Sequence, residues 1–110
     1  MIITNLKTDI NMEKESFRHL IETSDLVLVD FYATWCGPCK AMHPILEELK
    51  RKLGNRIRIA KIDVDKQQHL AAYYQIQSVP TLILFKKGTI KWRQSGAMPL
   101  HELLHRIESM

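Results

Sequence analysis

The chain has 110 residues, of which 45% are hydrophobic and 25% charged, and its formal net charge is +4. This length and composition predict a single globular domain, residues 1–110, that can bury its own hydrophobic core. The basic residues form no long run and are not interleaved with aromatic residues, which argues against a nucleic-acid-binding protein.

Membrane insertion and export are also not indicated by the sequence. No stretch reaches the ~18 apolar residues that a membrane-spanning helix needs. The first ten residues lack the basic start and apolar core of a secretory signal. We therefore expect a soluble, cytoplasmic protein that does not bind membranes.

The first predicted elements are a short strand, a helix and a buried strand. Residues 2–5 are β-like, and apolar residues at helical spacing in 17–21 predict a helix with Asn11 as a candidate N-cap. Residues 26–33 are nearly all apolar and too few for a helix. Such a run is typical of a strand that is buried on both faces of a sheet.

The remainder of the chain predicts helices alternating with strands. Apolar residues in 42–53 form one face of a helix that Gly54 ends, and residues 56–64 read as a second buried strand. A short helix is predicted at 67–74, two strands around a turn at 87–88, and a last helix starting near Pro99. This order predicts an α/β fold with a mixed central sheet of about five strands and about four flanking helices.

Cys36 and Cys39, the only cysteines, lie between the buried strand and the first turn of the next helix. Reactive groups of open α/β folds gather at this place, outside the carboxyl ends of the strands. On a helical turn, residues three apart share a face, so the two thiols can reach each other. The partial positive charge of the helix start favours a thiolate on Cys36, which makes Cys36 the predicted nucleophile and Cys39 the resolving thiol.

Two other roles for this pair are a structural disulfide and a metal site. A purely structural disulfide across so small a loop would contribute roughly 2 kcal/mol at most, little for a domain that has a core. A zinc site needs four ligands, and the chain offers one Cys-x-x-Cys pair with His43 four residues beyond it. We therefore expect no metal, and thiol–disulfide exchange is the favoured chemistry.

The sequence around the pair resembles the thioredoxin family. The motif WCGPC at residues 35–39 follows VDFYA and precedes Lys-x-x-x-Pro. Further similar segments follow in order over nearly the whole chain: AKIDVD, Val79-Pro80-Thr81, the turn at Gly88 and Gly96-Ala97. The resemblance implies a thioredoxin fold and a thiol–disulfide oxidoreductase that reduces disulfides in other proteins.

The resemblance also implies roles for residues around the two thiols. Asp30, the one charge in the apolar strand, would be a buried proton acceptor for Cys39, with Lys61 assisting it. It implies a cis peptide bond before Pro80. The expected docking surface for an extended substrate segment consists of Trp35, Gly37, Pro38, Val79, Pro80, Gly96 and Ala97.

The implied protein is a monomer that holds no cofactor and that a thioredoxin reductase recharges with electrons from NADPH. The alternatives are a disulfide oxidase or isomerase of an exported compartment, and a non-catalytic binding module. The dipeptide Gly37-Pro38 places no positive charge beside Cys36, which favours a reductant. Tyr32 and Thr34 depart from the family pattern, and His43 adds a titratable group to which no role is assigned.

Overall fold

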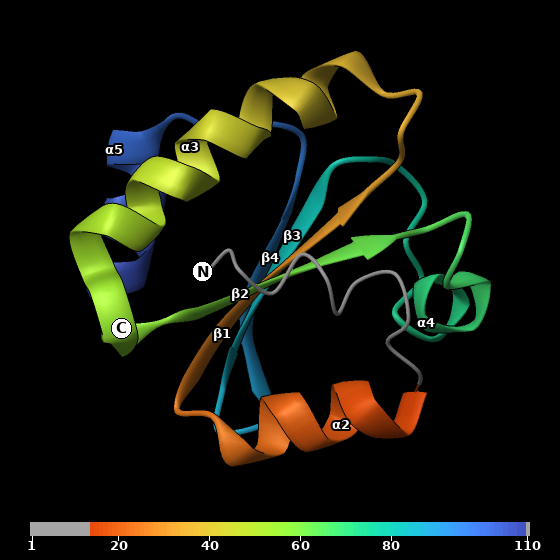
Figure 1. Ribbon diagram of the computed structural model, residues 1–110, viewed down its shortest axis with the longest axis horizontal. Helices are drawn as coiled ribbons and strands as arrows, with labels where there is room; N and C mark the ends of the chain where they lie inside the picture. The colour runs from red at the N-terminus through yellow and green to blue at the C-terminus, as the bar shows by residue number, and fades with distance from the viewer. Residues whose placement is uncertain (1–13, 110) are drawn as a thin grey trace.

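A mixed four-stranded sheet forms the centre of residues 14–109, the part of the chain that our computed structural model describes (Figure 1). The strand order is β2-β1-β3-β4. Strand β1 pairs in parallel with β2 and antiparallel with β3, and β3 pairs antiparallel with β4. The strands are β1 (Leu26–Tyr32), β2 (Arg58–Asp63), β3 (Thr81–Lys86) and β4 (Thr89–Ser95).

Helices cover both faces of this sheet. Helices α3 (Gly37–Leu53) and α5 (Leu100–Glu108) pack on one face (Figure 1). Helices α2 (Lys14–Thr23) and α4 (Gln68–Tyr73) pack on the other, and a 3-10 turn, η1 (Gly54–Arg56), follows α3. The predicted α/β fold with about four flanking helices is therefore confirmed.

Strand β1 lies in the middle of the core, and its side chains alternate between the two layers of helices. Val27, Val29 and Phe31 are buried with residues of α2 and α4, whereas Leu28 is buried with residues of α3 and α5. A strand that is covered on both faces needs apolar residues at successive positions, which explains the unbroken apolar run. By the same alternation Asp30 belongs to the face on which α3 packs.

The order of the elements from the first helix onward follows the prediction. The two buried strands and the short helix at 67–74 have boundaries within one or two residues of the predicted ones, and α2 and α3 extend beyond the apolar residues that predicted them. The residues expected as a first strand, 2–5, and the candidate N-cap Asn11 lie outside the described residues. The described strands thus number four, against about five expected from the whole chain. The predicted hairpin turn is present: Lys87 and Gly88 have φ of 51° and 86°, as a two-residue turn between antiparallel strands requires.

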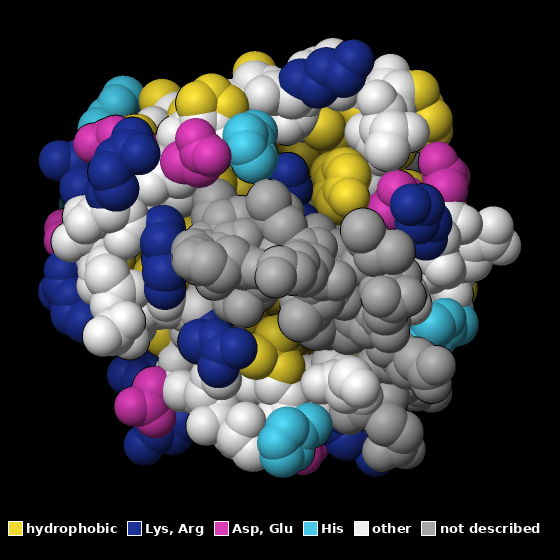
Figure 2. Space-filling view, viewed as in Figure 1, with side chains coloured by type: hydrophobic (Ala, Val, Ile, Leu, Met, Phe, Trp, Pro, Cys, Tyr) yellow, Lys and Arg dark blue, Asp and Glu magenta, His cyan; other side chains and the backbone are white. Residues whose placement is uncertain are grey.

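Basic side chains of the described residues are spread over the visible surface, with no single cluster. On the face shown in Figure 2, Lys and Arg side chains lie in several separate places, between acidic and uncharged side chains. None of the helices within residues 14–109 combines the length and apolar character needed to cross a bilayer.

The carboxyl end of α3 is closed by the side chain of Lys50. Its Nζ donates hydrogen bonds to the carbonyl oxygens of Gly54, at 3.0 Å, and Ile57, at 2.7 Å. Partial burial lowers the pKa of Lys50, and the nearby Arg58 lowers it further. The ammonium thus joins the last turn of α3 to the first residue of the 3-10 turn that follows it and to the residue after that turn.

We predict that Lys50→Met lowers the free energy of unfolding by about 1–3 kcal/mol, because methionine fills the same space but leaves two carbonyl oxygens without their charged donor. Urea unfolding at pH 7 measures this. Lys52→Met, at an exposed position of the same helix, is the matched control and should change stability by less than about 0.5 kcal/mol. Equal losses in the two variants would contradict the capping role.

Candidate redox-active site

Cys36 and Cys39 form a disulfide at the point where β1 leads into α3. Cys36 is the N-cap of the helix, and Cys39 lies in its first turn with a Cα–Cα distance of 5.3 Å. The backbone N–H of Cys39 donates to Cys36 Sγ at 3.1 Å. The first N–H groups of a helix have no partner within the helix, so the same donor can stabilise a thiolate at Cys36 once the disulfide is reduced.

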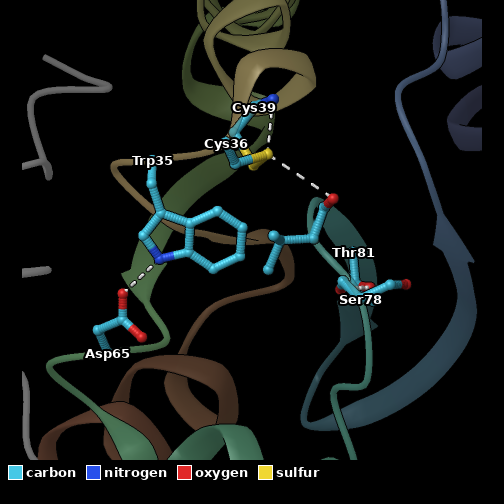
Figure 3. The surroundings of a disulfide bond; sticks show 7 residues. Trp35, Cys36, Cys39, Asp65, Ser78 and Thr81 are labelled. Atoms are coloured by element: carbon cyan, nitrogen blue, oxygen red, sulfur yellow. Dashed lines mark hydrogen bonds between the residues drawn. A yellow bond between two sulfur atoms is a disulfide. The ribbon is translucent and has the colours of Figure 1, made fainter.

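The disulfide is nearly enclosed by apolar neighbours. Each cysteine is only 4% exposed and packs with Ala33, while Tyr32, Val64 and Val79 contact the cluster. Cys36 Sγ lies 3.7 Å from the carbonyl oxygen of Val79 (Figure 3). In the disulfide this sulfur carries no hydrogen, so the approach is a contact; a reduced thiol can donate to the same oxygen.

The structure brings the seven expected docking residues to one region around Cys36. Trp35, Gly37 and Pro38 are exposed on either side of the cysteine, and Val79 approaches from the segment before β3. The Val79–Pro80 peptide bond is cis, as the resemblance implies. Gly96 adopts a φ of 93° after β4 and donates its N–H to the Pro80 oxygen at 2.8 Å, and the exposed Ala97 follows it.

Trp35 is held by a partner that the sequence did not reveal. Its indole is 70% exposed, and Nε1 donates to Asp65 Oδ2 at 2.9 Å (Figure 3). Asp65 follows β2 in a turn where the buried Asp63 accepts hydrogen bonds from the N–H groups of Asp65 and Lys66. The sequence signal that could have indicated this partner is Asp65 itself, the second acidic residue of AKIDVD, because it follows the strand that pairs with β1.

Asp30 is fully buried, as its apolar flanks predict. Neither of its carboxyl oxygens has a hydrogen-bond partner among the described residues. Burial raises the pKa of this carboxyl to about 7, although the positive charge of Lys61 acts in the opposite direction. Asp30 is therefore a carboxyl that can change its protonation state near neutral pH.

Lys61 lies opposite Asp30 in the pairing of β1 with β2, and it is only 8% exposed. Its Nζ lies 4.7 Å from the centre of the Tyr32 ring and 3.3 Å from His43 Nδ1. Tyr32, one of the two residues expected to depart from the family pattern, therefore contacts a residue of the site. Lys61, Tyr32 and Cys39 line an open hollow of about 430 Å³ with Ala33, Thr34, Lys40 and His43.

The described residues include no cluster of three or more His, Cys, Asp or Glu side chains suited to holding a metal ion. His43, the histidine considered as a third ligand, contacts Lys61 and Glu47. The geometry of the pair in this structure is that of a disulfide.

Comparison with known proteins adds an independent observation. The family model described as Thioredoxin matches residues 8–109. "Thioredoxin" from Bacillus subtilis is 45% identical over 89 residues, covering 77% of this chain and 86% of the relative. "Thioredoxin Y, chloroplastic" from rice is 52% identical over 95 residues, or 86% of this chain, but the chain spans only 56% of that relative's length.

A solved structure shows the same fold. Mitochondrial Thioredoxin 3 from Saccharomyces cerevisiae, in its oxidized form, superposes with a TM-score of 0.80 at 38% sequence identity. The match covers 87% of this chain and 89% of the yeast protein.

We predict that Asp30→Asn stabilises the fold at pH 7 and leaves it unchanged below about pH 4. A carboxyl whose folded pKa is about 7 and whose ordinary value is 3.8 binds protons more tightly in the folded state. It therefore lowers stability as the pH rises between those values. At about 1.4 kcal/mol per pH unit, the gain for asparagine is on the order of 3–4 kcal/mol at pH 7.

Urea unfolding of both proteins at pH 3.5, 5 and 7 tests this dependence. Asp65→Asn is the control, because that carboxylate is exposed and should not produce a gain that grows with pH. A gain from Asp30→Asn that does not change between pH 3.5 and 7 would show that the carboxyl does not titrate in this range.

Proposed function

Because the chain belongs to the thioredoxin family, we propose that it is a thiol–disulfide oxidoreductase that reduces disulfide bonds in other proteins. The observation that carries the proposal is the Cys36–Cys39 disulfide at the start of α3, with the exposed Trp35, Gly37 and Pro38 on either side of Cys36. A pair that can close to a disulfide without disturbing the fold can also donate two electrons when it opens.

The first step of the proposed reaction uses Cys36. Its thiolate attacks one sulfur of the substrate disulfide, forming a mixed disulfide and releasing the other substrate sulfur as a thiolate, which takes up a proton. The Cys39 N–H, 3.1 Å from Cys36 Sγ, supports the thiolate before the attack. Cys36 is suited to this role because its sulfur lies on the side of Val79 and the docking residues.

The second step uses Cys39 as the resolving thiol. Cys39 transfers its proton to the Asp30 carboxylate, and the resulting thiolate attacks Cys36 Sγ. This forms the intramolecular disulfide and releases the second substrate sulfur as a thiolate, which is then protonated. A pKa of about 7 makes Asp30 a proton acceptor that is partly ionised at neutral pH and still basic enough to accept a proton. Lys61 would assist by stabilising the carboxylate from its neighbouring position on β2.

Substrate docking is proposed at the surface formed by Trp35, Gly37, Pro38, Val79, Pro80, Gly96 and Ala97. An extended segment of the substrate would run beside Val79 and pair with its backbone, as in strand addition. Trp35 offers a large exposed ring for this contact, and its hydrogen bond to Asp65 limits the orientations that the ring can take.

For the return of electrons, we propose a thioredoxin reductase that draws on NADPH, so that the chain itself binds no cofactor. A reductant of this kind suits the cytoplasm, where thiols are kept reduced. The rice relative is named as chloroplastic, so related proteins also work in another compartment. We further propose that the chain acts as a monomer, with disulfide-containing proteins as its substrates and no role for nucleic acids or membranes.

We predict that Cys36→Ser abolishes insulin reduction, whereas Cys39→Ser forms a stable mixed disulfide with insulin. The reason is that Cys36 makes the first bond to the substrate and Cys39 breaks it. Turbidity of reduced insulin measures the first effect, and mass spectrometry under non-reducing conditions measures the second. Stable adducts with Cys36→Ser but not with Cys39→Ser would reverse the two roles.

We also predict that the oxidised protein supports NADPH consumption by a thioredoxin reductase. Absorbance at the NADPH band, followed with insulin as the final acceptor, measures the coupled reaction. The Cys36→Ser protein is the control and should give only the background rate. If the wild-type protein reduces insulin with dithiothreitol but receives no electrons from thioredoxin reductases, the proposed source of electrons is wrong while the activity stands.

A further inference from the structure

His43 lies one helical turn beyond Cys39 and bridges two charged side chains. Its Nδ1 is 3.3 Å from Lys61 Nζ, and its Nε2 is 3.2 Å from Glu47 Oε2. A lysine ammonium can only donate, so Nδ1 must accept, and a carboxylate can only accept, so Nε2 must carry the hydrogen. These contacts therefore define one neutral tautomer of His43, with its hydrogen on Nε2.

The Lys61 ammonium is hydrogen-bonded to His43 and not to its neighbour in the sheet, Asp30. Lys61 is the direct neighbour of Asp30 in the sheet, and the opposite charges would attract each other in a buried setting. Yet neither carboxyl oxygen of Asp30 has a hydrogen-bond partner among the described residues, so the ammonium of Lys61 does not bond to it. The ammonium lies instead against the Tyr32 ring and the imidazole.

We propose that His43 is a positioning residue that holds the Lys61 ammonium on the α3 side of the hollow beside Cys39 and away from the Asp30 carboxyl. The proposal deepens the proposed function and rests on it, because Asp30 is the proton acceptor of that reaction. It gives a role to a side chain for which the family resemblance supplied none.

The consequence concerns the basicity of Asp30. Direct contact with an ammonium would favour the carboxylate and make it a weaker base. With the ammonium held at His43, Lys61 still lowers the pKa of Asp30, but desolvation remains the larger effect. The carboxyl thus keeps the proton affinity that it needs to accept the Cys39 proton.

The other charged and titratable groups around this place do not supply the same effect. Lys40 lines the hollow but is exposed, and Glu47 is half exposed, so solvent screens both charges. Among the described residues, Tyr32 from β1 also lines the hollow, and the two cysteines beside it form a disulfide and do not titrate. Because the imidazole is neutral in these contacts, removing it changes the field at Asp30 through the movement of Lys61.

The test is a double-mutant cycle read by the titration of Asp30 in the oxidised full-length protein. The midpoint is measured from the side-chain carboxyl ¹³C shift in the wild type, His43→Ala, Lys61→Met and the double variant. We expect His43→Ala to lower the midpoint by about 1 pH unit, because Lys61 then moves to Asp30. In the Lys61→Met background the same change should have no effect.

The comparison in the Lys61→Met background tests whether the midpoint changes because of water and not because of Lys61. Water that enters the space left by the imidazole would also lower the midpoint, but it would do so with or without Lys61. An equal decrease in both backgrounds, or no decrease in either, overturns the proposal.

Two further variants control for structure. His43→Asn places an amide oxygen near the position of Nδ1 and should restore the wild-type midpoint, and it serves the cycle if His43→Ala does not fold. His101→Ala removes an exposed histidine of α5 and should leave the midpoint unchanged. A midpoint for His43→Asn that matches His43→Ala would show that the acceptor at this position has no role.

Activity provides a separate readout. The pH profile of insulin reduction by His43→Ala should move in the same direction as the Asp30 midpoint. The double variant and Lys61→Met should have the same pH profile, because the effect of His43 acts through Lys61. If wild-type protein does not reduce insulin, the proposed function fails, but the titration cycle still shows whether His43 positions Lys61. The two failures are therefore distinguishable.

Discussion

The burial of β1 between two layers of helices is the constraint on which the rest of the structure depends. Its backbone is paired with β2 on one side and β3 on the other, and its side chains enter both halves of the core. Both edges of β1 are thus occupied, and the chain leaves the sheet at the carboxyl end of the strand to form the next element. That element is α3, and Cys36 stands at the junction as its N-cap. The redox-active pair is thus placed by a strand that is buried and paired on both sides.

The same strand carries a group that works against its burial. Asp30 has no exposed surface and no hydrogen-bond partner among the described residues, and desolvation raises its pKa to about 7. A hydrophobic residue at this position would be better for stability at neutral pH. Retaining a carboxyl there is understandable if the chemistry of the pair needs a base close to neutrality, and groups of this kind are characteristic of active sites.

The surroundings of the disulfide differ on its two sides, and this difference matches the two roles proposed for the cysteines. Cys36 Sγ lies beside the Val79 carbonyl, where the loop before β3 meets the exposed Trp35 and the glycine after β4. Cys39 instead borders the hollow that contains Lys61 and His43. Cys36 therefore lies beside the proposed docking residues, and Cys39 lies beside the polar groups to which the proposed proton transfer assigns a role.

Local patterns in the sequence determined the order and type of the elements, the burial of residues 26–33, the position of the two cysteines before a helix and the resemblance to the thioredoxin family. These features depend on periodicity and spacing over a few residues, which the sequence displays directly. The tertiary structure alone decided that Trp35 bonds to Asp65 across 30 residues and that Lys61 contacts His43 across 18. Such contacts depend on how strands and helices pack and on which way long side chains turn. The pairing of β1 with β2 places Lys61 beside Asp30, and from that pairing alone an ion pair between these two residues would be expected. No spacing along the chain encodes that choice, because the competing acceptors for Lys61 come together only when α3 packs on the sheet.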